Sequence, residues 1–566
     1  GRLTSESDAY GNTTTYDYDE MDRLVRVTDP LDGTWEYEYD DLGNVTKVTD
    51  ALGNETYYSY NINGQVTEVT NAAGNTATTD YDTYGRVVST TDFGGTETTY
   101  EYDEYDRVIL TTTDGEETSY TYDEYGYLIE VEDPTGTIYY DYNSDGFLSS
   151  VTNAAGETIS YEYNDGYQLS KITIDGQDIE YGYDSKGRLV SVTDSEGTTT
   201  YSYDINGNRA STTYPNGVVT TYEYNDINVL TRQISKDSTG TVIASFEYTI
   251  GDNGERLSVT ELNRTVEYEY DELNRLTKET VTTGSTVSVT EYTYDANSNR
   301  TSMKKDGVTT TYDYNELNQI TRAGNVNYTW DNAGNLVTET TTTGVLVASF
   351  TYDCHNRMVS ANVSTNSSSI LETYEYDYLG NRTAKTSGGV TTNYVTDLSS
   401  GYSQVLKAEI GTSTVYYTRG LELISRREGS IASYYLYDGG LSVRALTNEA
   451  GTVTDTLVFD AFGNETGRTG TTDSPYGFQS EEQDATGLYY LRARYMDPAT
   501  GTFTTMDTYG GSLTDPMSLH KYLFTNSNPV MYSDPSGHEA TLQGIVTAMT
   551  ISAILSAADS GITYYL

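Results

Sequence analysis

The sequence contains very little cysteine, histidine, proline or tryptophan. Of its 566 residues, one is Cys, three are His, eight are Pro and two are Trp. The single cysteine, Cys354, excludes a disulfide scaffold and a cysteine-rich zinc site. The three histidines, His355, His520 and His538, are too few for a histidine metal cluster or a histidine-based triad. We therefore expect no cofactor and no metal site.

Basic residues are scarce as well. The chain has 32 basic and 85 acidic residues, for a formal net charge of -53. A surface this acidic repels a polyanion, so we expect no nucleic-acid partner. Charge is spread through the chain and there is no Gly-X-Y period, which excludes a simple membrane-spanning or collagen-like protein.

Tyrosine, in contrast, is abundant, with 58 residues. Its side chain buries a large area while keeping a polar tip. A chain rich in Tyr and Thr and poor in Pro is typical of β-strands. The composition therefore predicts a folded β-protein despite the high charge.

A repeat of the form Tyr-x-Tyr-Asp/Asn dominates the chain. Its Asp or Asn marker recurs every 20 or 21 residues from position 19 to position 225, and at less regular spacing from 271 to 377. The markers are Asp19, Asp40, Asn61, Asp82, Asp103, Asp123, Asn143, Asn164, Asp184, Asp204, Asn225, Asp271, Asp295, Asn315, Asp331, Asp353 and Asp377. Regularity over this length indicates an array of structural repeats.

Each repeat unit predicts one β-hairpin. Turn signals such as Asp82-Thr-Tyr-Gly-Arg86 and Ala73-Gly-Asn75 supply the positive φ of tight turns. Between the turns, stretches such as Arg23-Leu-Val-Arg-Val-Thr28 alternate between apolar and polar residues. One hairpin cannot bury its apolar face, but stacked units can share one. About 18 units would give roughly 36 strands, and the inherent twist of a sheet would coil such a ribbon into a shell or tube.

The repeat resembles the YD repeat of the RHS (rearrangement hotspot) family, from residue 1 to about residue 540. That family includes C subunits of insecticidal toxin complexes, bacterial polymorphic toxins, wall-associated proteins and the teneurin shell. The resemblance implies an all-β fold: a long antiparallel hairpin ribbon spiralled into a hollow shell, with a C-terminal plug and a short terminal helix. It also implies that the shell encloses a C-terminal payload.

The C-terminal part of the chain is similar to the RHS repeat-associated core domain. The similarity rests on the motifs Tyr476-Gly-Phe-Gln479, Gly487–Phe503 and Leu519–His538. In the family this domain closes one end of the shell. The expected domains are a YD-repeat shell (1–380), diverged repeats (381–475), the core domain or plug (476–540) and an apolar tail (541–566).

The segment Pro529-x4-Asp534-Pro535-x-Gly537 resembles the self-cleavage signature of the family. The resemblance implies that Asp534 acts as in an aspartyl protease and that the chain is cut after the next residue. That residue is His538, where the family has Leu, which puts the cleavage in question. Asp-Pro-x-Gly is also a favourable turn sequence, so a purely structural role remains the alternative.

Aspartyl chemistry needs a second carboxyl, because one group takes a proton from water while the other protonates the carbonyl oxygen. No motif identifies this partner. Asp507 and Asp497 are the candidates. Cys354 and His355 lie in a diverged repeat turn, and we expect a structural role for them.

Residues 541–558 carry no charge. Their Ala, Ser and Thr content favours a buried or interfacial helix over a membrane span. In the family the variable toxin begins here, so the tail is expected to be the start of a truncated or vestigial payload.

The leading hypothesis is a structural shell of a secreted bacterial polymorphic toxin, which encapsulates and delivers its own C-terminal toxin segment. An upstream or separate chain, or secretion machinery, would complete the shell. The alternative is a cell-surface adhesion or carbohydrate-binding protein whose partners are surface glycans. Autoproteolysis is the only enzymatic activity expected.

Overall fold

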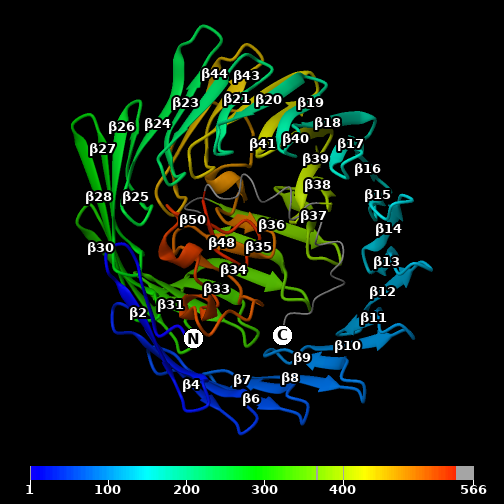
Figure 1. The fold of residues 1–566 in the computed structure, drawn as a ribbon, viewed down its shortest axis with the longest axis vertical. Coiled ribbons are helices and arrows are strands. Elements are labelled where there is room, and N and C mark those ends of the chain that lie inside the picture. Colours follow the sequence, from blue (N-terminus) through cyan, green and yellow to red (C-terminus); the bar gives the residue numbers. More distant parts are fainter. Residues whose placement is uncertain (1, 365–367, 400, 544–566) are drawn as a thin grey trace.

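The computed structural model describes residues 2–364, 368–399 and 401–543, and these are almost entirely β-structure (Figure 1). From β1 (Ser5–Ser7) to β45 (Glu465–Thr469), each strand pairs antiparallel with its neighbours along the chain. The predicted hairpin ribbon is confirmed. The ribbon has 45 strands instead of about 36, because the diverged residues 381–475 continue the same pairing.

The ribbon makes two windings, named here the first winding (β1–β24) and the second winding (β25–β45). The strands of the first winding are β1 (Ser5–Ser7), β2 (Thr13–Tyr18), β3 (Leu24–Thr28), β4 (Thr34–Tyr39), β5 (Val45–Thr49), β6 (Glu55–Tyr60), β7 (Val66–Thr70), β8 (Thr76–Tyr81), β9 (Val87–Thr91), β10 (Glu97–Tyr102), β11 (Val108–Thr113), β12 (Glu116–Tyr122), β13 (Leu128–Asp133), β14 (Gly136–Tyr142), β15 (Leu148–Thr152), β16 (Thr158–Tyr163), β17 (Leu169–Ile174), β18 (Gln177–Tyr183), β19 (Leu189–Asp194), β20 (Gly197–Tyr203), β21 (Arg209–Thr213), β22 (Val219–Tyr224), β23 (Leu230–Lys236) and β24 (Val242–Ile250). Those of the second winding are β25 (Arg256–Glu261), β26 (Arg264–Tyr270), β27 (Leu276–Thr283), β28 (Thr286–Tyr294), β29 (Arg300–Lys305), β30 (Val308–Tyr314), β31 (Ile320–Ala323), β32 (Val326–Trp330), β33 (Leu336–Thr341), β34 (Leu346–Tyr352), β35 (Met358–Ser364), β36 (Ser369–Tyr376), β37 (Arg382–Ser387), β38 (Val390–Asp397), β39 (Gln404–Ile410), β40 (Ser413–Arg419), β41 (Leu423–Glu428), β42 (Ile431–Tyr437), β43 (Val443–Asn448), β44 (Val453–Phe459) and β45 (Glu465–Thr469).

The repeat motif has a specific bonding role in each hairpin. Oδ1 of the marker Asp82 accepts the backbone N–H groups of Tyr84 (2.8 Å) and Arg86 (3.0 Å), while its Oδ2 accepts Nε of Arg86 (2.7 Å). The Arg86 guanidinium lies 4.6 Å from the ring centroid of Tyr102 in the next hairpin. The Tyr102 hydroxyl donates to the carbonyl of Val87 (2.6 Å). The second tyrosine thus ties neighbouring hairpins together through its hydroxyl, which phenylalanine could not do.

The two windings lie side by side, joined by residues 191 to 264 positions apart in sequence. At one end Asn253 donates to Asp8 (2.7 Å), and further along Gln233 donates to the carbonyl of Tyr437 (2.6 Å). In Figure 1, strands β19–β23 of the first winding accordingly lie beside β40–β44 of the second. A buried apolar cluster that includes Val131 and Leu436 fills this junction. Sheet twist and side-chain burial together account for the coiled ribbon.

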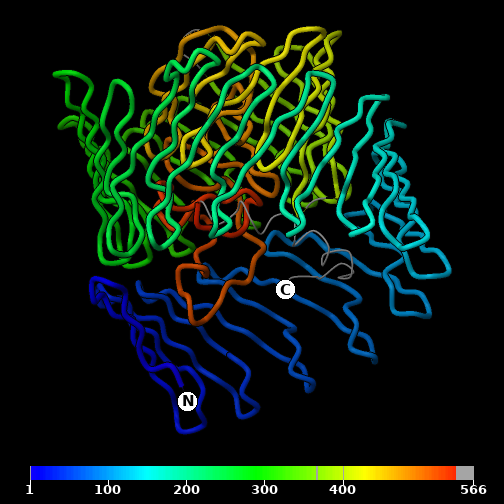
Figure 2. Tube along the Cα trace, turned by 45° about the horizontal axis from the view of Figure 1, so that its top comes forward, coloured from blue at the N-terminus to red at the C-terminus, as the bar shows by residue number. Residues whose placement is uncertain are grey.

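Residues 476–543, named here the plug, leave the ribbon and lie inside the second winding (Figure 1, orange to red). Its elements are η1 (Phe478–Ser480), β46 (Glu482–Gln483), β47 (Tyr489–Leu491), β48 (Arg494–Asp497), β49 (Thr502–Phe503), η2 (Pro516–Leu519), η3 (Thr525–Ser527), β50 (Tyr532–Ser533) and β51 (Thr541–Leu542). Figure 2 shows one plug loop reaching toward the N-terminal strands, where the Tyr37 hydroxyl donates to the carbonyl of Leu513 (2.7 Å).

Thr541 and Leu542 form strand β51, which pairs with β50. The helix expected over 541–558 is therefore not formed at Thr541 and Leu542, which pair as a strand instead. From residue 544 on, the expected helix lies outside the described residues. Among the residues that the structure does describe, no helix is long and apolar enough to cross a membrane.

Candidate functional site

The plug has an aromatic core that it shares with the second winding. Phe478, Tyr489, Phe503 and Phe524 are all buried in one apolar cluster with side chains of strands β38–β44. Phe478 and Phe524 have ring centroids 6.5 Å apart. Burial of rings this large is the main source of attraction between plug and shell.

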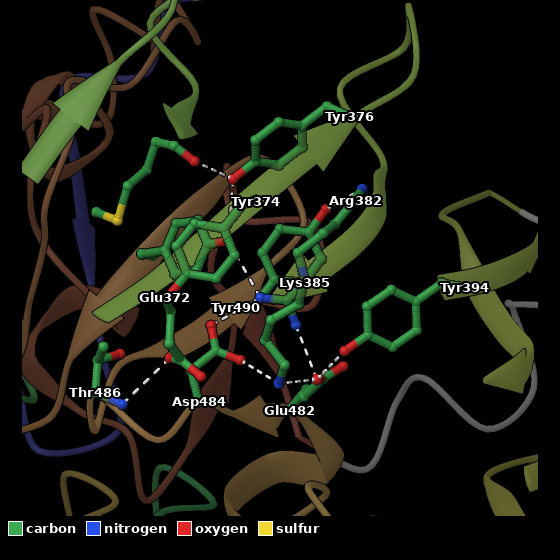
Figure 3. Close-up of polar contacts among 12 residues, drawn as sticks. Glu372, Tyr374, Tyr376, Arg382, Lys385, Tyr394, Glu482, Asp484, Thr486 and Tyr490 are labelled. Carbon is green, nitrogen blue, oxygen red and sulfur yellow. Dashed lines mark hydrogen bonds and ion pairs between the residues drawn. The ribbon is translucent and has the colours of Figure 1, made fainter. Parts of the chain in front are cut away.

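Beside this core, a buried ion network fastens the plug to the shell (Figure 3). Arg382 and Lys385 of β37 face Glu482 and Asp484 of the plug. The Lys385 Nζ lies 2.7 Å from Glu482 Oε1 and 2.8 Å from Asp484 Oδ1. The Tyr394 hydroxyl donates to the same Glu482 oxygen (2.6 Å). Burial alone would raise the pKa of Glu482, but Lys385 and Arg382 hold it below its usual value.

The Asp-Pro-x-Gly segment forms a buried turn of the plug. The Asp534 side chain is 2 % exposed, and the backbone N–H of Gly537 points to the Asp534 carbonyl at 3.4 Å. Gly537 has φ +77°, and a Cβ there would collide with the Leu491 carbonyl. The glycine is therefore required by close approach of backbone as well as by the turn itself.

The structure brings Asp534 and Asp507 together around one arginine. The Arg494 Nη2 atom lies 2.8 Å from Asp507 Oδ2 and 3.6 Å from Asp534 Oδ2. All three side chains are at most 8 % exposed. Burial raises the pKa of Asp534, the Arg494 charge opposes this rise, and the Asp507 charge adds to it. The arrangement is a closely spaced pair of carboxyls with unequal surroundings, as acid–base chemistry requires.

His538 contacts both acids. Its backbone N–H donates to Asp534 Oδ1 at 2.9 Å, and its ring Nδ1 lies 2.9 Å from Asp507 Oδ1. The residue that would precede the cleaved bond is therefore held against both carboxyls. The remaining signature residues have supporting roles: the Pro529 carbonyl accepts from Gln543 (3.0 Å), and the Pro535 carbonyl accepts from Arg492.

Asp497, the other candidate partner, belongs to a separate cluster. Its carboxylate accepts the backbone N–H of Ala499 (2.9 Å) and the hydroxyl of Thr500 (3.0 Å). It lies near Glu339 of β33, whose pKa is raised to about 8 by burial and then by the Asp497 charge.

Arg494 was not singled out from the sequence, although it organises the acid pair. Its guanidinium lies 3.6 Å from the ring centroid of Phe503, and its Nη1 donates to the Lys521 carbonyl at 3.1 Å. The sequence offered one signal, which is that Arg494 belongs to an Arg-Ala-Arg motif in a chain with few basic residues. Arg494 contacts Asp507, Lys521 and Asp534, which lie in separate segments of the plug. The spacing of these residues in the sequence does not show that they meet.

The fold, the repeat and the plug together define a YD-repeat shell. The teneurin YD-shell family model matches residues 51–170 and 241–530, more than half of the chain, and an RHS-repeat model matches residues 1–34, 22–55 and 183–219. The chain belongs to the teneurin YD-shell family. The expected family resemblance is thereby confirmed.

Among curated proteins, the chain is similar to the tRNA3(Ser)-specific nuclease WapA of Bacillus spizizenii. The two are 36% identical over 175 residues, which cover 29% of this chain and 7% of that protein. It is also 37% identical over 65 residues to toxin subunit YenC1 of Yersinia entomophaga, covering 12% of this chain and 6% of that protein. The chain thus spans less than a tenth of the length of these relatives.

Solved structures share the fold over nearly the whole chain. The crystal structure of TcdB2-TccC3-Cdc42 superposes with a TM-score of 0.80 at 16% identity, covering 96% of this chain and 32% of that one. The Photorhabdus luminescens Tc holotoxin pore gives a TM-score of 0.63 at 15% identity, covering 94% of this chain and 34% of that one. The predicted shell architecture is confirmed by this likeness, and the chain corresponds to about a third of each solved chain.

Proposed function

We propose that this chain is part of a secreted bacterial toxin shell that encloses and delivers a C-terminal payload. The observation that carries the proposal is the position of the plug inside the second winding, fastened there by the Arg382–Asp484 ion pair. The last described residue, Gln543, is held within the plug, where its Nε2 donates to the Pro529 carbonyl at 3.0 Å. Similarity to toxin subunit YenC1 supports a toxin context.

Enclosure is tested by protection from a protease. A short peptide with a specific protease site is added after Leu566, and the same peptide is added ahead of Gly1 in a matched chain. If the shell encloses the segment that follows the plug, the C-terminal site is cut far more slowly than the N-terminal one. Equal rates of cutting would contradict the proposal.

A further chain or an upstream repeat segment completes the shell in this proposal. In the second winding, turns that follow Tyr-x-Tyr strands rest on the first winding: Asn297 donates to Asp50 (2.6 Å) and Asn356 to Asp92 (2.9 Å). The equivalent turns of the first winding expose large apolar side chains. These are Met21, Leu42, Ile62, Tyr84, Tyr105, Tyr125, Ile205 and Ile227. A preceding winding would cover this row as the first winding covers the second. The fold likeness to TcdB2-TccC3, of which this chain covers 31%, supports such an extension.

We further propose that the plug cuts its own chain after His538. In this mechanism a water oxygen bonds to the His538 carbonyl carbon while its proton passes to Asp507. Asp534, whose pKa is raised by burial, gives a proton to the carbonyl oxygen. The resulting tetrahedral intermediate then collapses and the C–N bond to Glu539 breaks. The proton on Asp507 moves to the leaving nitrogen, and a hydroxyl of the intermediate returns its proton to Asp534. Arg494 positions the pair.

A surface adhesin that binds glycans was the alternative. Tyr84, Tyr105 and Tyr125 are the three most exposed tyrosines among the described residues, and a glycan would stack on such rings. Serine substitutions of all three distinguish the two functions. Loss of binding to bacterial or host glycans would favour an adhesin, whereas loss of association with a further winding would favour the shell.

A further inference from the structure

The single cysteine of the chain lies against a glutamate from the other winding. Cys354, in the turn between β34 and β35, donates its thiol to Glu116 Oε2 with Sγ and the oxygen 3.6 Å apart. Glu116 begins β12 of the first winding, 238 residues earlier in the chain. His355 follows directly. One donor atom from each of the three residues lies within 4.8 Å of the other two.

We propose that Glu116, Cys354 and His355 bind a Zn²⁺ ion that links the first winding to the second. A thiolate, an imidazole and a carboxylate are the three kinds of side-chain ligand that zinc takes in proteins. Zinc bonds of about 2.0–2.3 Å place tetrahedral ligands about 3.5 Å apart. The three donor atoms already lie within 4.8 Å of one another. The fourth position is then left to water.

The charges around the cysteine favour a cation. The Glu116 carboxylate lies directly against the Cys354 thiol, with Oε2 3.6 Å from Sγ. The nearest arginine, Arg357, is already paired with Asp353, with Nε 2.7 Å from Oδ2. The site therefore presents acidic groups to a metal without a free cation competing for them.

The location gives the metal a structural purpose. Near Cys354 the windings meet through polar turn-to-turn contacts, such as the hydrogen bond from Asn356 to Asp92. The large apolar cluster of the junction reaches this strand only at its margin, through the partly buried Tyr120 of β12, and its first fully buried member is Val131. A metal at this point would join the windings at the edge of that cluster. Because only the folded chain brings the three ligands together, zinc binding would stabilise the coiled form.

The test uses the full chain, reduced and freed of metal. Zinc affinity is measured by competition with a coloured chelator, and Co²⁺ serves as a spectroscopic substitute. We expect one ion per chain, a thiolate-to-cobalt charge-transfer band, and a melting temperature that rises with zinc concentration. A cobalt complex that lacks the thiolate band would overturn the proposal, as would the absence of stoichiometric zinc binding.

Three variants, Cys354→Ser, His355→Asn and Glu116→Gln, distinguish a link between windings from binding to the Cys-His pair alone. Each is expected to weaken zinc binding by more than about 100-fold, since even residues that only support metal ligands contribute about 10- to 100-fold. The control Glu117→Gln, an exposed neighbour on β12, is expected to bind as the wild type does. Unchanged affinity in Glu116→Gln would overturn the proposal, and the zinc-free melting temperatures show that each variant folds.

Discussion

Arg382 of the shell and Asp484 of the plug form an ion pair in which Nη1 and Oδ2 are 2.7 Å apart and both side chains are almost fully buried, at 1 % and 0 % exposure. A pair this deeply buried does not in general add net stability, but removing one partner leaves the other charge buried with less compensation, which is destabilising. The pair therefore helps to hold the plug in place, because a displaced plug would leave these buried charges without partners.

Asp484→Asn is expected to loosen the plug. The change removes one of the two carboxylates that face Arg382 and Lys385 and should lower the free energy of unfolding by up to about 3–5 kcal/mol. Limited proteolysis should then cut the plug before the windings. Asp313→Asn is the matched control, because Asp313 pairs with Arg322 in an exposed bridge (2.7 Å, 54 % and 45 % exposed) worth at most about 1 kcal/mol. Equal losses from both changes, seen in chemical denaturation, would argue against a plug anchor.

The stability of the second winding should depend on pH through Glu279. Burial and then the Asp460 charge raise the pKa of Glu279 from 4.5 to about 8. The folded chain thus keeps a proton that the unfolded chain releases. The contribution of Glu279 to the free energy of unfolding is therefore largest below pH 4.5 and falls as the pH rises toward about 8.

Glu279→Gln removes this titration. Between acid pH and pH 8, we expect the free energy of unfolding of the variant to rise by on the order of 3 kcal/mol relative to that of the wild type. Unfolding midpoints measured across that pH range give the comparison. Glu267→Gln, an exposed site on β26, should follow the wild-type pH profile. A Glu279→Gln profile parallel to the wild type would show that Glu279 is ionised in the fold.

His538→Leu should speed the self-cleavage. The His538 ring occupies Oδ1 of Asp507 at 2.9 Å while Arg494 holds Oδ2 at 2.8 Å, so Asp507 must release one of these contacts before it takes a proton from water, which slows the wild type. Leucine frees Oδ1, and an available general base contributes about 10²-fold or more. The appearance of the shortened chain over time, followed by mass spectrometry, measures the rate. A slower His538→Leu would mean that the imidazole itself takes part in the reaction.

The hairpins could be predicted from the sequence because each one is local. The marker Asp82 bonds residues only two and four positions away, and spacing reveals such contacts directly. Asp507 could be proposed as a partner of Asp534 because both lie in the same motif-rich segment. Its role in cleavage stays a prediction until it is measured.

The contacts between windings could not be predicted, because they depend on how tightly the ribbon coils. Glu116 and Cys354 are 238 residues apart, and a small change in twist per hairpin would place a different turn at that point. The expectation of no metal site was based on the numbers of cysteines and histidines. The proposed zinc site depends instead on which residues meet across the junction, and the sequence alone does not show this.

The most direct test of the account is the intact mass of the full chain beside that of Asp534→Asn. The account predicts that the wild type loses the 28 residues after His538 and that Asp534→Asn keeps them, while both remain folded with the plug in place. Full-length mass for both chains, after prolonged incubation, would contradict an active carboxyl pair in the plug.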